Sequence, residues 1–158
     1  MSRPVLLLDL DGVLNPFAAS PCPPGYLEHD FYPGEDLVRY CPDHAAWITE
    51  LAAAGDLRWA TAWGEEANTL YAPKLGIDPL PVVTFPPIPF PPESKVPAIA
   101  AAVGDGPVAW IDDNHTDAGR KWASERAAPT LLVPIDSAIG WTREDVDRVL
   151  AWAAGQQT

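Results

Sequence analysis

The amino-acid sequence predicts an α/β fold with a central parallel sheet and helices on both faces. Strand-like and helix-like segments alternate along the chain, as they do when parallel strands are joined by crossover helices. The apolar runs 5–8 and 108–111 do not alternate with polar residues, so both are expected to be strands buried on two faces. A length of 158 residues fits a single domain that spans residues 1–158.

The first half of the chain adds two helices and a second strand to the strand at 5–8. Residues 43–54 place apolar side chains at helical spacing and are expected to form a helix. Residues 57–60 are expected to form a short buried strand. A second helix is predicted over residues 65–74, and Gly76 supplies its stop signal.

The second half of the chain continues the same alternation. Residues 82–84 are a weaker strand candidate. Ser94 is expected to cap a helix that runs to about residue 103, with Pro97 tolerated in its first turn. After the strand at 108–111 we expect a helix at 117–125, a strand at 131–133, and a helix from its cap Thr142 to about residue 154.

Two proline-rich stretches interrupt the alternation. Residues 15–42 contain six prolines, and residues 78–92 contain seven. That proline content is incompatible with a helix and favours extended backbone. We therefore expect a loop or flap at 15–42 and a second loop at 78–92.

Composition and charge narrow the function classes. The formal net charge of −12 argues against a broad nucleic-acid-binding face, and leaves room for a small basic site. No apolar run reaches the ~18 residues that span a bilayer, and the N-terminal run is too short for a signal peptide. We therefore expect a cytoplasmic protein without a membrane partner, whose Cys22 and Cys41 are free thiols.

The strongest local signal is the segment Asp9-Leu10-Asp11-Gly12, directly after the strand at 5–8. Carboxylates two residues apart on extended chain point the same way. Such like charges raise a pKa unless a cation intervenes, and proteins place them together chiefly for acid–base chemistry or a metal. An acidic turn without further function is the alternative, because Asp-Gly is a common turn pair.

A second acidic pair, Asp112-Asp113, follows the strand at 108–111. Parallel strands end at one edge of a sheet, where open α/β sheets bind their ligands. Two acidic pairs at that edge offer hard oxygen ligands suited to Mg²⁺ rather than zinc. The alternative is that these residues cap the following helix.

Thr61 and Lys95 are the remaining candidates, both as phosphate ligands. Thr61 ends the strand at 57–60, and its hydroxyl can bond a phosphoryl oxygen. Lys95 begins a helix, where its charge opposes the helix dipole. Delivering positive charge to a phosphate explains that position, whereas a solvated surface lysine is the alternative. Lys74 competes with Lys95 for this role.

These four segments, in this order, resemble the haloacid-dehalogenase-like (HAD) hydrolase superfamily. The two acids separated by one residue are similar to its phosphatase branch, in a minimal-cap or capless form. The resemblance implies a Rossmann-like fold in which Asp9 is the nucleophile and Asp11 the general acid and base. It further implies phosphate contacts from Thr61 and Lys95. The metal Mg²⁺ is expected at Asp9, the Asp11 backbone carbonyl, Asp112 and Asp113.

The resemblance therefore predicts a magnesium-dependent phosphohydrolase that acts on a phosphomonoester through an aspartyl-phosphate. The substrate is expected to be a small molecule, a nucleotide or a nucleic-acid end, because the layout is similar to HAD phosphatase domains of nucleic-acid repair proteins. Two alternatives are a catalytically silent interaction module with the same fold and a phosphotransferase.

Other residue groups carry weaker hypotheses. Cys22, His29, Cys41 and His44 could form a zinc site, although their spacing matches no familiar zinc pattern. His115 is expected at the rim of the metal site and not as a ligand. Aromatic side chains that could stack on a base, or simply pack, are Phe17, Tyr26, Phe31, Tyr32 and Trp63.

Overall fold

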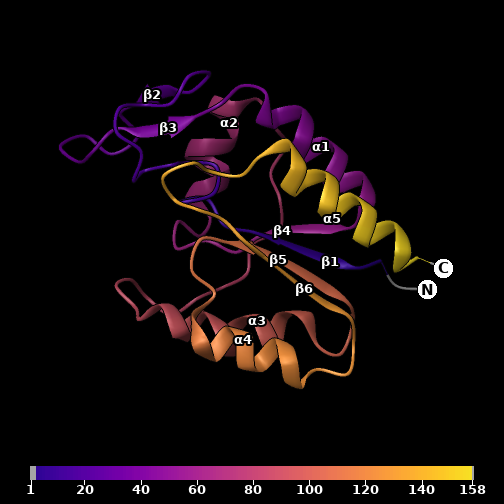
Figure 1. Cartoon of the computed structure of the whole chain (residues 1–158). Helices are drawn as coiled ribbons and strands as arrows, with labels where there is room; N and C mark the ends of the chain where they lie inside the picture. Colours follow the sequence, from indigo (N-terminus) through magenta and orange to yellow (C-terminus); the bar gives the residue numbers. More distant parts are fainter. Residues whose placement is uncertain (1–2, 158) are drawn as a thin grey trace.

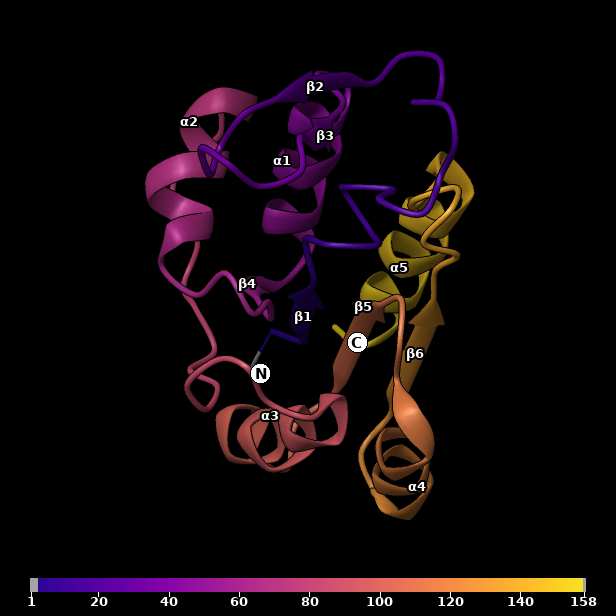
Figure 2. The ribbon, with the colours of Figure 1, turned by 90° about the vertical axis from the view of Figure 1, so that its left-hand side faces the viewer.

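The computed structural model describes residues 3–157 and has an α/β architecture with a parallel sheet (Figure 1). The four sheet strands lie in the order β4 (Asp56–Trp59), β1 (Val5–Leu8), β5 (Val108–Asp112) and β6 (Thr130–Pro134). Helices α1 (His44–Ala54) and α5 (Arg143–Gly155) cover one face, and α3 (Lys95–Val103) and α4 (Thr116–Glu125) cover the other (Figure 2). This confirms the predicted parallel sheet flanked by helices, an arrangement consistent with a Rossmann-like fold.

The central strand β1 explains why its sequence is a continuous apolar run. Leu6 and Leu8 pack into the cluster under α1 and α5, whereas Val5 and Leu7 pack into the cluster under α3. Leu6, Leu7 and Leu8 are fully buried. Burying a leucine side chain stabilises the fold by about 1.5–3 kcal/mol, so both layers hold β1 in place and hold the residues that follow it.

The segment 15–42 contains a small antiparallel hairpin, β2 (Leu27–His29) paired with β3 (Val38–Tyr40). The prediction of a loop or flap at 15–42 did not include this hairpin. Three-residue strands between prolines show too little alternation to be recognised from the sequence. Both proline-rich stretches lie on the side of the molecule where the sheet strands end (Figure 1).

Two further predictions need correction. The helix expected at 65–74 is a π-helical turn, Ala67–Tyr71, followed by α2 (Ala72–Leu75), and it ends at Gly76 (φ +84°) as predicted. The strand expected at 82–84 is a single bridge between Val82 and Trp59. Prolines on both sides of this segment lack the N–H that a longer ladder requires.

The two predicted helix caps differ in the structure. Thr142 forms a capping box with Asp145 at the start of α5, as predicted. Ser94 has helical backbone (φ −69°, ψ −12°) and its side chain makes no capping hydrogen bond, so that prediction was wrong. The short 3₁₀ turn Pro92–Ser94 runs directly into α3 and leaves Ser94 in helical geometry instead of cap geometry.

Thr142→Ala is expected to lower the free energy of unfolding by about 1 kcal/mol, because it removes a capping side chain. Ser94→Ala is the matched control and is expected to change it by less than about 0.5 kcal/mol. Urea denaturation followed by circular dichroism measures both. Equal losses in the two variants would contradict the capping assignment.

His44 is a buried histidine on the first turn of α1. Its ring lies among Tyr26, Trp47 and Trp141, and its Nδ1 has no hydrogen-bond partner within residues 3–157. Burial lowers the pKa of His44 to about 4. The folded protein therefore holds this imidazole neutral at pH values where the unfolded chain binds a proton.

The stability of the protein is expected to fall as the pH drops from about 6.5 towards 4, because protonation of His44 favours the unfolded chain. The free energy of unfolding is expected to be higher above pH 6.5 than below pH 4, and His44 accounts for at most about 3 kcal/mol of that difference. Urea denaturation across this range, compared with His44→Phe, isolates the effect from other titrating groups. Parallel pH profiles in the two proteins would refute it.

Candidate functional site

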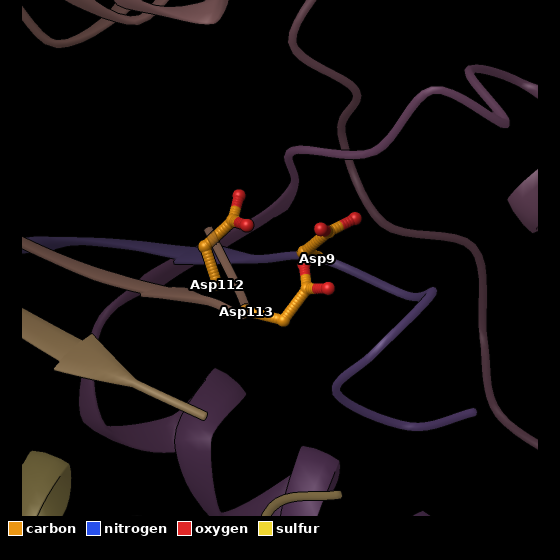
Figure 3. Close-up of side chains that lie close together, drawn as sticks. All are labelled: Asp9, Asp112 and Asp113. Carbon is orange, nitrogen blue, oxygen red and sulfur yellow. The ribbon is translucent and has the colours of Figure 1, made fainter. Parts of the chain in front are cut away.

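Three carboxyl groups meet where β1 and β5 end side by side. Leu8 pairs with Ile111 in the sheet register, so the next residues, Asp9 and Asp112, emerge next to each other. One oxygen from each of Asp9, Asp112 and Asp113 lies within 4.8 Å of the others (Figure 3). Asp9 and Asp112 are buried, with 5% and 1% of their surface exposed. Of the four acids predicted to meet at this edge of the sheet, the structure therefore brings three together and leaves Asp11 outside the group.

Lys95 reaches this cluster from the first turn of α3. Its Nζ donates to Asp112 Oδ2 at 2.8 Å, to Asp9 Oδ2 at 3.2 Å and to the Ala60 carbonyl at 3.3 Å. Burial by itself lowers the pKa of Lys95, but the two carboxylates outweigh it and raise the pKa above its usual value. Lys74 lies instead over the Tyr40 ring. Of the two candidate lysines, Lys95 is the one at the cluster.

Burial and mutual repulsion disfavour the charged forms of Asp9 and Asp113. Burial, and then the nearby Asp112 carboxylate, raise the pKa of Asp9 well above its usual value, and Lys95 opposes that shift only in part. Burial and Asp112 likewise raise the pKa of Asp113 to about 6. A divalent cation bound among the three groups relieves this repulsion.

Two neighbouring groups hold Asp112 in one orientation. Its Oδ2 accepts a hydrogen bond from Trp110 Nε1 at 3.1 Å, and its Oδ1 accepts one from the Asn114 N–H at 2.9 Å. Sequence reasoning missed Trp110 as a site residue because tryptophan in a buried strand signals packing. The indole N–H lies two residues before Asp112, on the same side of the strand, which is the signal that could have found it.

Asp11 lies beside the cluster and is held apart from it. Its Oδ1 accepts from Asn15 Nδ2 and its Oδ2 accepts from Trp63 Nε1, both at 2.9 Å. Its carboxylate is outside the group of three that could hold a metal. Asn15 was not singled out from the sequence, and Trp63 was considered only for stacking. The segment that begins at Asp9 also forms a turn, so the acidic site and the acidic turn, predicted as alternatives, are the same segment.

Thr61 is buried at the end of β4, next to the Ala60 carbonyl that Lys95 contacts. Its Oγ1 accepts a hydrogen bond from the Trp63 N–H at 3.2 Å. The acceptor side of the hydroxyl is therefore used by the backbone, while its proton can be donated to a ligand. Thr61 thus lies two residues after Trp59, the last residue of the strand next to β1.

The second proline-rich loop forms one wall of the site. A recess of about 300 Å³ is lined by Asp9, Lys95, Asp112 and Asp113 on one side and by Ile88 and Phe90 on the other. A recess of this volume admits a small ligand. The loop 78–92 therefore contributes apolar surface next to the charged cluster.

The residues proposed for zinc do not assemble a site. Across residues 3–157, the trio of aspartates is the one group of three or more possible metal ligands. Cys22 and Cys41 are free thiols, as predicted. His29 packs against Phe31, and His44 is enclosed by aromatic rings. His115 lies outside the trio of aspartates, where it is buried against Trp110.

Comparisons with known proteins find no match for the chain, either among protein-family models or among curated proteins. In the part of the chain that the structure describes, none of the helices has the length and apolar character needed to cross a bilayer.

Lys95→Met is expected to lower the free energy of unfolding by about 3–5 kcal/mol at pH 7 in a chelating buffer, because it leaves buried carboxylates without their cation. Lys121→Met is the control. Lys121 pairs with Glu125 on the exposed surface, and its replacement is expected to change stability by less than about 1 kcal/mol. Urea denaturation measures both, and equal effects would contradict the structural role of Lys95.

Proposed function

We propose that this protein is a magnesium-dependent phosphohydrolase that acts on a phosphomonoester. The observation that carries the proposal is the meeting of Asp9, Asp112 and Asp113 with the buried Lys95 at the carboxyl ends of adjacent parallel strands. The trio supplies oxygen ligands for a cation, and Lys95 supplies a positive charge for an anion. Together they suit a phosphate group and a metal side by side.

The donor set fits magnesium. Asp9, Asp112 and Asp113 offer hard oxygen atoms within 4.8 Å of one another, with no nitrogen or sulfur ligand among them. Asp9, Asp112 and Asp113 would hold Mg²⁺, which would offset their negative charge and supply Lewis-acid polarisation of a phosphoryl group. The side chain of Asp11 lies outside this donor set, so its part is in proton transfer.

The carboxylate of Asp9 acts as the nucleophile. One of its oxygens forms a bond to phosphorus while the bond from phosphorus to the alcohol oxygen breaks, which leaves an aspartyl-phosphate. Asp11 protonates the departing alcohol oxygen. It then takes a proton from the water that attacks phosphorus, and inorganic phosphate leaves with Asp9 restored.

Lys95 and Thr61 hold the phosphoryl oxygens during both steps. The Lys95 ammonium lies within hydrogen-bond distance of Asp9, which places positive charge where the nucleophile meets the phosphate. The Thr61 hydroxyl can donate its proton to a second phosphoryl oxygen. Without this neutralisation the carboxylate of Asp9 would be repelled by the phosphate dianion.

The protein is expected to hydrolyse p-nitrophenyl phosphate with Mg²⁺ and not in a chelating buffer. Asp9→Asn is expected to lower kcat on the order of 10³-fold or more, because the amide is not a nucleophile. Asp117→Asn, at an exposed acid of α4 outside the site, is the control and keeps its activity. Colorimetric assay tests each protein. Activity without Mg²⁺, or in Asp9→Asn, would overturn the assignment.

Asp11→Asn is expected to slow alkyl phosphates more than p-nitrophenyl phosphate, because p-nitrophenolate leaves without help from an acid. General acid catalysis contributes about 10²–10⁴-fold, so the two losses should differ by at least about tenfold. The measurement is kcat/KM for both esters, with release of inorganic phosphate as the common readout. Equal losses would remove Asp11 from the role of acid.

A further inference from the structure

A second recess is lined by Asp11, by the hairpin and by Trp63, which precedes the π-helical turn. It has a volume of about 490 Å³, within the usual size range of small-molecule sites. Its lining includes Asp11, Phe17, Tyr32, Glu35, Asp36 and Trp63. Because Asp11 protonates the departing alcohol in the proposed reaction, this recess is where that alcohol is expected to lie.

Aromatic side chains make up much of the wall. The rings of Tyr32 and Trp63 are 5.1 Å apart at an angle of 60°, and the exposed Phe17 lines the same recess. Trp63 also donates its indole N–H to Asp11 at 2.9 Å, so it joins the aromatic wall to the acid. Aromatic faces attract cations through their ring quadrupole.

The recess is also strongly acidic. Asp11, Glu35 and Asp36 line it, and no basic side chain does so within residues 3–157. Burial, followed by the carboxylates of Glu66, Asp11 and Glu35, raises the pKa of Tyr32 above its usual value. Arg39, the basic residue of the hairpin, bonds the Pro16 and Ala19 carbonyls and Glu28 instead. A negative potential therefore fills the space beside the aromatic wall.

We propose that this recess selects phosphomonoesters whose alcohol carries a positive charge, that is, phosphorylated amino alcohols. This inference rests on the proposed phosphohydrolase function. A quaternary or primary ammonium group would be attracted both by the aromatic faces and by the carboxylates. A nucleic-acid end would bring further phosphates towards Glu35 and Asp36 and be repelled, and the neutral nucleoside of a nucleotide would gain nothing from these carboxylates.

The decisive comparison is between phosphocholine and 3,3-dimethylbutyl phosphate, which has the same shape but a neutral carbon in place of the ammonium nitrogen. With Mg²⁺ present, phosphocholine is expected to give a kcat/KM about tenfold higher. In Glu35→Gln/Asp36→Asn that ratio is expected to fall to about threefold or less. Asp30→Asn/Asp43→Asn changes net charge equally at exposed positions outside the recess, and keeps the ratio.

A binding measurement makes the test independent of turnover. Choline is titrated into the protein while tryptophan fluorescence is followed, with Trp63→Phe as the reference that lacks the reporter in the recess. We expect saturable quenching that is absent from Trp63→Phe, weaker in Glu35→Gln/Asp36→Asn, and reduced by added salt.

The two proposals fail in different ways. If neutral esters are hydrolysed but phosphocholine has no advantage and choline does not bind, the recess inference is overturned while the phosphohydrolase stands. A preference for nucleoside monophosphates would also overturn the inference. If no ester is hydrolysed with Mg²⁺, the phosphohydrolase fails, and choline binding at Trp63 alone decides whether the recess accepts a cation.

Discussion

The contact of Lys95 with Asp9 and Asp112 is the interaction on which the rest of the site depends. Two acids at the ends of adjacent strands repel each other in a buried setting, and the lysine offsets that repulsion at 3.2 and 2.8 Å. The same contact ties the first turn of α3 to β1 and β5. A positive charge in a first helical turn is unfavourable on its own, so the carboxylates and the helix start stabilise each other.

The contact of Lys95 with Asp9 and Asp112 also determines the position of the second proline-rich loop. Within this loop, the residues after Val82 connect its bridge to α3, and both ends of the connection are fixed against the sheet. Ile88 and Phe90 are therefore held beside the acidic trio. On the other side, Phe31, Trp63 and Tyr71 pack together, with ring centroids 5.5 to 5.7 Å apart, and link the hairpin to the π-helical turn. Charged groups thus lie between two walls of apolar and aromatic surface.

Local patterns in the sequence predicted the sheet, the main helices and the meeting of Asp9, Asp112 and Asp113. They succeeded because strand ends of a parallel sheet share one edge, so residue position alone brings these acids together. Lys95 begins a helix, and only the family resemblance favoured it over Lys74. The hairpin was missed because its pairing depends on partners eleven residues apart in short strands, such as Glu28 and Arg39. The hydrogen bonds of Asn15 and Trp63 to Asp11 were missed for a related reason, since side-chain orientation depends on packing that no local pattern encodes.

Gly12 carries a consequence for how this chain can vary. Its backbone is left-handed (φ +83°), and a Cβ atom at this position would overlap the side chain of Asp113. Either constraint alone disfavours a larger residue, and the two are independent. Substitution of Gly12 therefore requires a different turn and a displaced Asp113 at the same time. The exposed acids of the hairpin are under neither constraint. The charge of the hairpin can accordingly change while the turn after Asp11 stays the same.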